Sequence, residues 1–341
     1  MTRQAAGETR ARVKPFKVII PAAGEGRRLR PHTHTRPKVL IEVAGKPIIG
    51  HIVERILAAG PTEICVVVGY RGNEVSSYLS ASFDCPFQFV EQDDPKGLGD
   101  AVYRACDCVG DGPVLVMLGD TIVDMDLVDI VQGGNSVGVC EVEDPRRFGV
   151  VEQSDGRIVR LVEKPVDPPS NLALVGVYFL ESAGEIFDSL ERLIAEDRRT
   201  RGEYQLTDAL QLMIDSGARL EARPVQHWLD CGTPRALLET NRYLLDHSPP
   251  ASVSSGRPGC VLVPPVFVHE SATLEDSVVG PHVSVGANAL VRRSVVADSI
   301  VNQDAVVEHS VLEHSILGEG CVIKDRPRSL NVGGLSEFRT T

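Results

Sequence analysis

A short stretch near the start of the sequence combines glycine with positive charge. Residues 22–38 read AAGEGRRLRPHTHTRPK and hold two glycines together with Arg28 and Lys38. Glycine lets backbone N–H groups approach phosphate oxygens, and the two cationic side chains neutralise phosphate charge. The stretch is not a dinucleotide fingerprint, because Leu29 stands at the third glycine position, and no GK[ST] follows as in a Walker loop. Taken alone, it indicates a polyphosphate site or a solvated loop.

Two carboxylates follow apolar residues far apart in the chain. Asp120 ends the string VMLGD, and Asp230 follows an apolar pair in HWLDCGT and precedes a glycine turn. A carboxylate in such a place is costly unless a cation compensates it. An N-cap at the start of a helix is the structural alternative for Asp120.

The first two thirds of the sequence alternate β-branched runs with helical periodicity. Strands are predicted at 17–21, 64–68, 87–91 and 114–118. Helices are predicted near 47–59, 72–81, 98–108, 182–195, 204–215 and 234–245. This alternation predicts an α/β fold with a Rossmann-like, mostly parallel sheet that binds ligands at the carboxyl edge of its strands. Closer strands between 140 and 180 predict an antiparallel patch over that sheet.

The last third of the sequence is a repeat. Eleven units of five or six residues, each led by an aliphatic residue, run without a gap over 262–322. Such a period predicts a parallel β-helix with about three units per coil and the leading residues stacked inside. A β-sandwich is the alternative, but it would have longer strands and more turn glycines.

The predicted segments are a tail at 1–14, a first domain at 15–247, a Pro/Ser/Gly linker at 248–259, the β-helix at 260–325 and a second tail at 326–341.

Composition limits the classes of function. The 341 residues carry a net charge of -12, which argues against a broad nucleic-acid-binding face. No apolar run approaches the roughly 20 residues of a membrane span, and residues 1–14 lack the apolar core of a secretory signal. The eight cysteines are scattered without CxxC spacing, which is typical of reduced thiols in the cytoplasm. We therefore expect a cytoplasmic protein with small anionic ligands and neither a nucleic-acid nor a membrane partner.

The first stretch resembles a family signature. The string GxGxRLxPxTxxxPK is similar to that of the sugar-1-phosphate nucleotidylyltransferases, and it is formed by Gly24, Gly26, Arg28, Leu29, Pro31, Thr33, Pro37 and Lys38. The likeness continues along nearly the whole chain and is strongest to the long-form glucose-1-phosphate thymidylyltransferases, which end in a left-handed β-helix. Arg27 departs from the Thr common in that family and adds a cation without removing a matched group.

The resemblance implies a nucleotide site and a metal site. Arg28 and Lys38 would stabilise the triphosphate and the leaving pyrophosphate, while Asp120 and Asp230 would hold Mg²⁺, which prefers hard oxygen ligands and retains water. These four are the catalytic candidates. The expected nucleotide-binding residues are Ala23, Gly24, Gly26, Arg28, Gln92 and Gly97, the last two at the pyrimidine base. From the sequence alone, the Gln92 segment is only a turn that opens a helix.

The resemblance also implies an acceptor site. The expected sugar-phosphate residues are Gly149, Glu163, Lys164 and Gly176, with the lysine on phosphate and the glutamate on sugar hydroxyls. Glu203 and Asp208 are interpreted as scaffold or sugar-side support. The implied reaction is Mg²⁺-dependent nucleotidyl transfer from dTTP or UTP to a sugar 1-phosphate, with glucose 1-phosphate favoured and pyrophosphate released.

Other hypotheses remain open at this point. The chain would also suit a non-catalytic regulatory subunit that binds sugar nucleotides, or a bifunctional enzyme with acetyltransferase activity in the repeat. The repeat holds His269, His282, His309 and His314, but three to four coils are short for an acyl-CoA groove. His32 and His34 lack a third candidate metal ligand nearby. The flat faces and apolar end of a β-helix predict a homo-oligomer.

Overall fold

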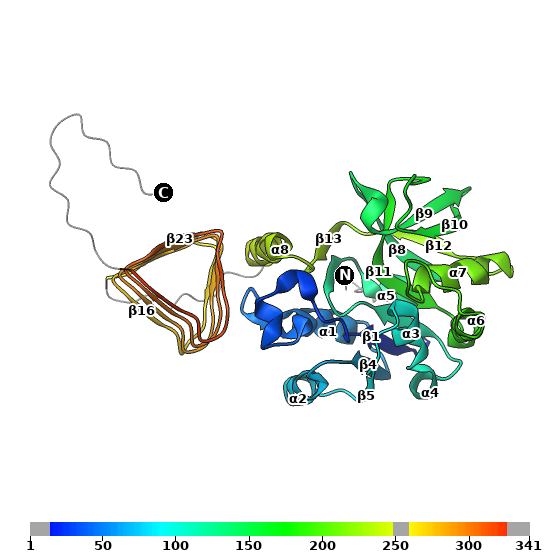
Figure 1. Ribbon diagram of the computed structural model, residues 1–341, viewed down its shortest axis with the longest axis horizontal. Coiled ribbons are helices and arrows are strands. Elements are labelled where there is room, and N and C mark those ends of the chain that lie inside the picture. The colour runs from blue at the N-terminus through cyan, green and yellow to red at the C-terminus, as the bar shows by residue number, and fades with distance from the viewer. Residues whose placement is uncertain (1–13, 248–258, 326–341) are drawn as a thin grey trace, which may run out of the picture. The chain divides into compact units, whose positions relative to one another are not determined.

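A computed structural model of the chain describes residues 14–247 and 259–325. Its contacts form two compact units, one made of residues 14–41 and 46–237 and the other of residues 42–45, 238–247 and 259–325 (Figure 1). The division falls inside helix α8 (Pro234–His247). The predicted tails and linker lie outside the described residues, apart from Lys14 and Gly259.

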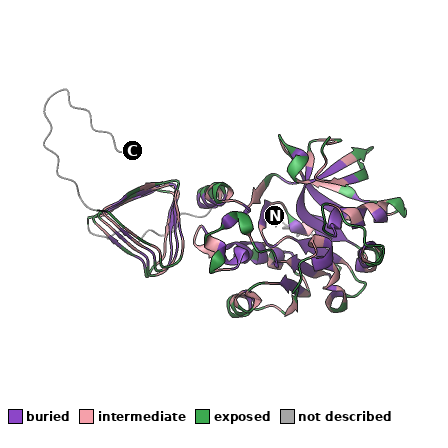
Figure 2. Ribbon diagram, viewed as in Figure 1, coloured by how far each residue is buried: buried purple, intermediate pink, exposed green. Residues whose placement is uncertain are grey.

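The centre of the first unit is a nine-stranded mixed sheet. Its parallel part has the order β6-β1-β4-β5, formed by β1 (Lys17–Pro21), β4 (Glu63–Val68), β5 (Phe87–Glu91) and β6 (Val114–Met117). The middle of β1 is fully buried, as expected for a central strand flanked by parallel neighbours (Figure 2). The predicted parallel sheet and its four strands are confirmed.

An antiparallel group continues this sheet on the β6 side. The group and its flanking strands comprise β7 (Thr121–Asp124), β8 (Ser136–Glu141), β9 (Gly149–Ser154), β10 (Arg157–Glu163), β11 (Leu172–Leu180), β12 (Glu221–Pro224) and β13 (His227–Asp230). β11 pairs with β6, β8 and β9, all antiparallel. The antiparallel strands were predicted, but they extend the sheet and do not lie over it, because the nine residues of β11 reach along the free edge of β6.

Helices connect and cover the strands. They are α1 (Ile48–Ala58), α2 (Gly72–Ser82), α3 (Leu98–Tyr103), α4 (Cys106–Val109), α5 (Leu127–Gln132), α6 (Ala183–Ala195) and α7 (Leu206–Asp215). The single helix predicted at 98–108 is two helices, because the Ala105 amide bonds the Val102 carbonyl at 3.1 Å and tightens the end of α3. Within the described residues, no helix has both the length and the apolar character to cross a bilayer.

Short elements complete the first part of the chain. They are β2 (Glu42–Val43), β3 (Lys46–Pro47), and the 3-10 helices η1 (Arg27–Leu29), η2 (His32–His34), η3 (Lys38–Leu40) and η4 (Pro145–Arg147).

The repeat forms a left-handed β-helix of three four-stranded parallel sheets, seen end-on as a triangle in Figure 1. One sheet contains β14 (Val261–Leu262), β17 (Val278–Val279), β20 (Val295–Ala297) and β23 (Val311–Glu313). The second contains β15 (Val266–Val268), β18 (Val283–Val285), β21 (Ile300–Val301) and β24 (Ile316–Leu317). The third contains β16 (Thr273–Glu275), β19 (Leu290–Arg292), β22 (Val306–Glu308) and β25 (Val322–Lys324).

The leading residues of the repeat line the inside of the β-helix, as predicted. Val279, Val291 and Val307 are fully buried within one apolar cluster. Val278 pairs with Val295, 17 positions on, whereas Val295 pairs with Val311, 16 positions on. The coil lengths therefore equal the sums of three units of five or six residues.

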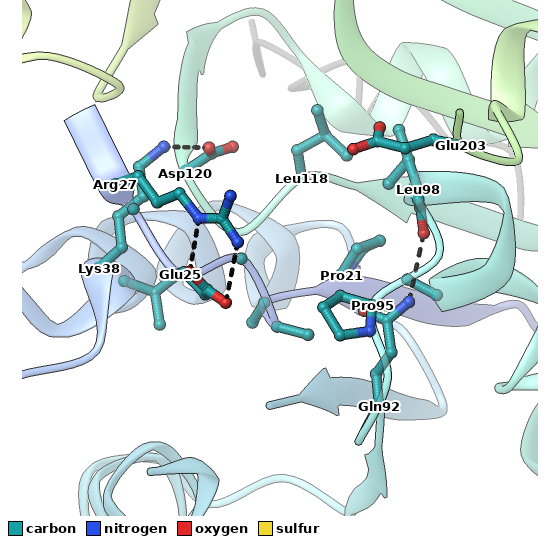
Figure 3. A pocket seen from close by; sticks show the side chains of 17 residues that line it. Pro21, Glu25, Arg27, Lys38, Gln92, Pro95, Leu98, Leu118, Asp120 and Glu203 are labelled. Atoms are coloured by element: carbon teal, nitrogen blue, oxygen red, sulfur yellow. Dashed lines mark hydrogen bonds and ion pairs between the residues drawn. The ribbon is translucent and has the colours of Figure 1, made fainter. Parts of the chain in front are cut away.

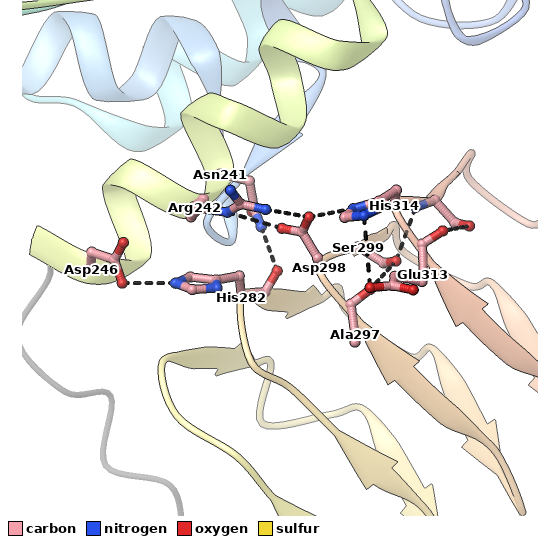
Figure 4. Close-up of polar contacts among 10 residues, drawn as sticks. Asn241, Arg242, Asp246, His282, Ala297, Asp298, Ser299, Glu313 and His314 are labelled. Atoms are coloured by element: carbon pink, nitrogen blue, oxygen red, sulfur yellow. Dashed lines mark hydrogen bonds and ion pairs between the residues drawn. The ribbon is translucent and has the colours of Figure 1, made fainter.

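The second half of α8 packs on one side of the β-helix (Figure 4). Asn241 is 1% exposed and uses both ends of its amide, donating to the His282 carbonyl at 3.1 Å and accepting from the Ser284 hydroxyl at 2.8 Å. Arg242 donates to both carboxylate oxygens of Asp298, which also contacts His314. These polar contacts fix α8 to the middle coils.

Candidate active site

The glycine loop leaves the end of β1 and turns back on itself. Gly26 has a φ of 64°, and a Cβ there would lie 2.9 Å from both Lys38 Cβ and Thr33 Cγ2. Only glycine combines this left-handed backbone with so close an approach. Leu29 is fully buried below the loop, so Arg28 on the exposed side is held at a defined place. Arg27, the departure from the signature, pairs with Glu25 at 2.7 Å.

Lys38 and Asp120 form an ion pair at the base of the site (Figure 3). Lys38 is only 7% exposed, and Asp120 lies between β6 and β7, close to the glycine loop, because the Gly119 amide bonds the Pro21 carbonyl at 3.0 Å. Burial is the largest influence on the pKa of Asp120 and acts to raise it, but Lys38, a backbone N–H and Arg28 together bring that pKa below its ordinary value. Asp120 is therefore ionised, with a cation already beside it.

Asp230 joins Asp120 through strand pairing. β13 runs antiparallel to β7 and places Asp230 opposite Thr121, while the Cys231 amide bonds the Asp120 carbonyl at 3.1 Å. Burial, followed by the charge of Asp120, raises the pKa of Asp230 above the ordinary value. A Cβ at Gly232 would lie 2.6 Å from Arg28 Nη2 and 2.8 Å from Asp230 Oδ1. The sheet thus brings both aspartates and the glycine-loop arginine together.

The two aspartates suit a divalent ion that takes part of its coordination from substrate. Two anionic carboxylates repel one another here, and a hard cation would relieve that repulsion. Residues 14–247 and 259–325 hold no cluster of three or more His, Cys, Asp or Glu able to bind a metal. Phosphate oxygens and water would have to complete the shell, which is typical of Mg²⁺.

One cavity, of about 490 Å³, lies between the glycine loop and the ends of β5 and β6. Its lining includes the predicted residues Ala23, Gly24, Gly26, Lys38, Gln92, Gly97 and Asp120. Gln92 is 6% exposed and donates its amide N–H groups to Asp100 Oδ2 at 2.7 Å and to the Gly97 carbonyl at 3.2 Å. Its amide orientation is thereby fixed, because both of these partners accept hydrogen bonds. Gly97 has a φ of 118°, and a Cβ there would lie 2.5 Å from the Tyr204 carbonyl.

A second cavity, of about 380 Å³, lies on the other side of Asp120. Its lining includes the predicted residues Arg28, Asp120, Gly149, Glu163, Lys164, Gly176 and Asp230. Glu163 accepts from the Thr207 hydroxyl at 2.8 Å and pairs with Lys164 at 2.9 Å. Asp120 and Glu203 line both cavities, so the two spaces meet at these carboxylates. Asp208, the other residue interpreted as support, is not among the residues that line them.

The glycines of the second cavity meet two different needs. A Cβ at Gly149 would lie 3.0 Å from Thr207 Oγ1 and 3.1 Å from Glu163 Oε2, so the glycine leaves room for that hydrogen-bonded pair. Gly176 has a φ of 85° at an irregularity in β11, and its carbonyl accepts from the Leu118 amide at 3.0 Å. This irregularity lies where β11 lines the second cavity.

The structure adds residues that the sequence did not single out. Arg147, Phe148, Thr207 and Trp228 line the second cavity. Arg146 is held by Asp144 through contacts of 2.7 and 3.0 Å, whereas its neighbour Arg147 reaches the cavity. The charge of Arg147 partly opposes the rise in the pKa of Asp230. The sequence shows two adjacent arginines before FGVVE but not which one faces the site. The rings of Trp228 and Phe148 meet edge to face at 4.6 Å.

A glycine loop with cations, two adjoining carboxylates and two cavities that meet at Asp120 form a site that suits nucleotide-like anions. Residues 17–247 match the nucleotidyl transferase family, and the chain belongs to that family.

Relatives and solved structures agree with this assignment. The chain is 37% identical over 242 residues to the low-salt glycan biosynthesis nucleotidyltransferase Agl11 of Haloferax volcanii, covering 68% of this chain and 66% of that protein. It is 34% identical over 307 residues to a glucose-1-phosphate thymidylyltransferase of Streptomyces antibioticus, covering 82% and 85%. The structure of a UDP-glucose pyrophosphorylase complexed with UDP-glucose matches with a TM-score of 0.62 and 28% identity, covering 69% of this chain and 100% of the other.

Proposed function

We propose that the protein transfers a nucleotidyl group from dTTP or UTP to a sugar 1-phosphate, with glucose 1-phosphate favoured, and releases pyrophosphate. The observation that carries this proposal is the meeting of two cavities at Asp120, with cations on both sides. Thymidylyl transfer to glucose 1-phosphate is the activity named for the relative from S. antibioticus. The solved UDP-glucose pyrophosphorylase supports a sugar nucleotide as the product.

The reaction needs no protein nucleophile. An oxygen of the acceptor phosphate attacks the α-phosphorus and forms the new P–O bond, while the bond from that phosphorus to the bridging oxygen breaks and pyrophosphate leaves. The protein holds the two anions in line and offsets their charge. We assign two cations to the triphosphate: Lys38, which is buried beside Asp120, and Arg28, which lines the second cavity close to Asp230.

Asp120 and Asp230 would hold Mg²⁺. The ion would supply a positive charge that screens the two substrates from one another and stabilises charge on the phosphoryl oxygens. The low pKa of Asp120 keeps that ligand ionised. Asp230 lies beside it across the β7–β13 pair, with Arg28 close by.

The first cavity suits a pyrimidine base. The Gln92 amide N–H groups are already donated to Asp100 and Gly97, which leaves the amide oxygen to accept a hydrogen bond. Thymine and uracil both present an imide N–H to such an acceptor, and cytosine does not. Gly97 adds close approach to the backbone, because no side chain stands between it and the cavity.

The second cavity suits the sugar phosphate. Glu163 is almost buried, accepts from Thr207 and pairs with Lys164, and its remaining acceptor capacity would serve hydroxyl groups of a sugar. Lys164 and Arg147 bring two cations to the same space for the phosphate. Trp228 and Phe148 provide a rigid apolar wall.

A pyrophosphate-release assay on purified protein with magnesium, dTTP or UTP and glucose 1-phosphate tests the proposal. Lys38→Ala and Asp120→Asn should each lower kcat/KM by about 10² to 10³ with the circular dichroism spectrum unchanged. Arg146→Ala is the control and should leave the rate intact, since that side chain is held by Asp144. Near wild-type turnover in either site variant, or wild-type protein that binds a sugar nucleotide without turnover, would contradict the proposal. A matrix of nucleotides and sugar phosphates then fixes selectivity.

A further inference from the structure

The three outer faces of the β-helix differ in what covers them. The face of β15, β18, β21 and β24 is occupied by its own chain. A Cβ on Gly45 would lie 2.2 Å from the Phe267 ring, and Ser284 donates to Asn241 of α8. Arg242 of α8 donates to Asp298 (Figure 4). This face is therefore not available to a partner.

The face of β16, β19, β22 and β25 carries a column of alternating charge. Glu275, Arg292, Glu308 and Lys324 stand in register on successive coils. Arg292 contacts Glu275 at 2.6 Å and Glu308 at 3.2 Å, and Lys324 contacts Glu308 at 3.0 Å. The charges of this column satisfy one another within the chain and remain hydrated, as on an ordinary solvent-facing surface.

The face of β14, β17, β20 and β23 is apolar, and none of the contacts among the described residues covers it. Val261, Val278, Val295 and Val311 are paired in register on its outside. Val261 is 56% exposed, Val295 43% and Val311 79%. With Val263, this face holds four of the eight exposed large hydrophobic residues in the described part of the chain. A second outer column runs through Val263, Gly280, Ala297 and Glu313, so only the last position is charged. We call these eight outer positions the valine face.

Opposite charges stand at one border of the valine face. The corner before each strand is formed by Gly259, Asp276, Arg293 and His309, all with left-handed backbone. Asp276 and Arg293 are 3.9 Å apart, with side chains 64% and 60% exposed, so they are paired only loosely within the chain. They occupy the second and third of the four corners, at equal distances from the middle of the column.

We propose that the valine face binds a second copy of this chain about a two-fold axis parallel to its strands. Such an axis reverses the order of the coils, so the valine column meets the same column of the other copy. It also places Asp276 opposite Arg293 of the second copy, and Arg293 opposite its Asp276. This reciprocal complementarity favours pairing with a second copy over an unrelated partner. When the order of the coils is reversed, each charge of the border faces the opposite charge of the other copy.

The size of the valine face sets the strength of this association. Four strands spaced about 4.8 Å apart, each contributing about 10 Å of length, give a patch of roughly 200 Å². A standard interface buries about 800 Å² per partner. The valine face alone therefore supports a weak dimer, with a dissociation constant near or above the micromolar range.

Sedimentation equilibrium of the full chain over a range of concentrations tests the proposal. The wild type should show a monomer–dimer equilibrium. Val295→Glu, near the axis, should raise the dissociation constant at least tenfold. Val322→Glu is the matched control, because Val322 is 57% exposed on the face that carries the charge column, and this variant should associate like the wild type. Melting curves of both variants establish that each is folded.

A charge exchange tests the symmetry. Asp276→Arg or Arg293→Asp alone should weaken the dimer through like-charge contact, and the double exchange should restore it. A wild-type monomer at all concentrations, equal association of Val295→Glu and wild type, or a closed trimer would each overturn the proposal. Pyrophosphate release is measured separately, so this inference and the proposed activity fail independently.

Discussion

The candidate active site and the charged face of the β-helix both contain pairs of carboxylates, but they arrange them differently. In the site, Asp120 and Asp230 adjoin each other, and burial raises the pKa of the second. On the β-helix, Glu275 and Glu308 are separated by Arg292, and their pKa values are lowered by hydrogen bonds from Arg292 and Lys324 respectively. Like charges forced together mark a place where a ligand is expected, whereas alternating charges mark a surface that is already satisfied.

The largest effect should come from removing one of the adjoining carboxylates. Asp230→Asn should lower kcat/KM by about 10² to 10³, because it removes a charge aimed at the proposed magnesium. Without metal, the same variant should melt at a higher temperature than the wild type near pH 7. The folded-state pKa of Asp230 is raised, so ionisation costs stability as the pH rises from its unfolded pKa through its folded pKa. Differential scanning calorimetry at pH 5 and pH 7, in the presence of a metal chelator, measures the difference in melting temperature between the variant and the wild type.

The activity and the melting temperature of Asp230→Asn together distinguish a ligand-binding role of Asp230 from a structural one. A loss of activity together with a lower melting temperature would indicate that Asp230 is a structural residue. The metal requirement should also strengthen in acid: as the pH falls toward the raised pKa of Asp230, the magnesium concentration for half-maximal rate should increase. A magnesium requirement independent of pH would count against this ligand.

A smaller effect should separate two neighbouring arginines. Arg147→Ala should raise KM for the sugar 1-phosphate by roughly tenfold or more, the value of one charge-assisted contact, and leave KM for the nucleotide nearly unchanged. Arg146→Ala should change neither, because that side chain is paired with Asp144 outside the cavity. Initial-rate kinetics with each substrate varied in turn distinguish the two. Equal effects of both substitutions would show that Arg147 has no special place in the site.

The smallest effect should come from the charge column of the β-helix. Arg292→Ala removes a cation between two glutamates, yet the contact is solvent-exposed, so the melting temperature should fall only slightly and kcat/KM should not change. The residual difference should shrink further in 0.5 M salt as charges are screened. Thermal unfolding followed at both salt concentrations checks this, and a large, salt-independent loss would contradict the contrast between the two regions.

The sequence was informative where a residue stands beside a recognisable strand or repeat. Asp120 and Gln92 lie just past strands of the parallel sheet, and their places at one edge follow from that topology. The leading aliphatic residues likewise predicted the inside of the β-helix, because each recurs at a fixed spacing. The positions of these residues follow from periodicity and the direction of the strands, whereas the role predicted for Gln92 came from the resemblance to a known family.

Other features depend on contacts that spacing does not encode. Arg146 and Arg147 are adjacent, and only the bidentate contact with Asp144 decides which of them faces the cavity. Trp228 enters the site through the pairing of β13 with β7, which joins segments about a hundred residues apart. Which outer face of the β-helix is covered also depends on contacts, because α8 packs on one face through Asn241 and Arg242, and the repeat itself does not show which face that is.

The coils of this β-helix differ in length by one residue, which indicates where related chains can vary in length. Val278 to Val295 spans 17 positions and Val295 to Val311 spans 16, yet the hydrogen-bonded ladder is unbroken across both steps. The shorter coil has one residue fewer at the corner of Asp298, whose carboxylate contacts Arg242. Corners can thus absorb insertions and deletions that strands cannot, so related chains are free to vary in length at the vertices of the prism while the stacked interior keeps its register.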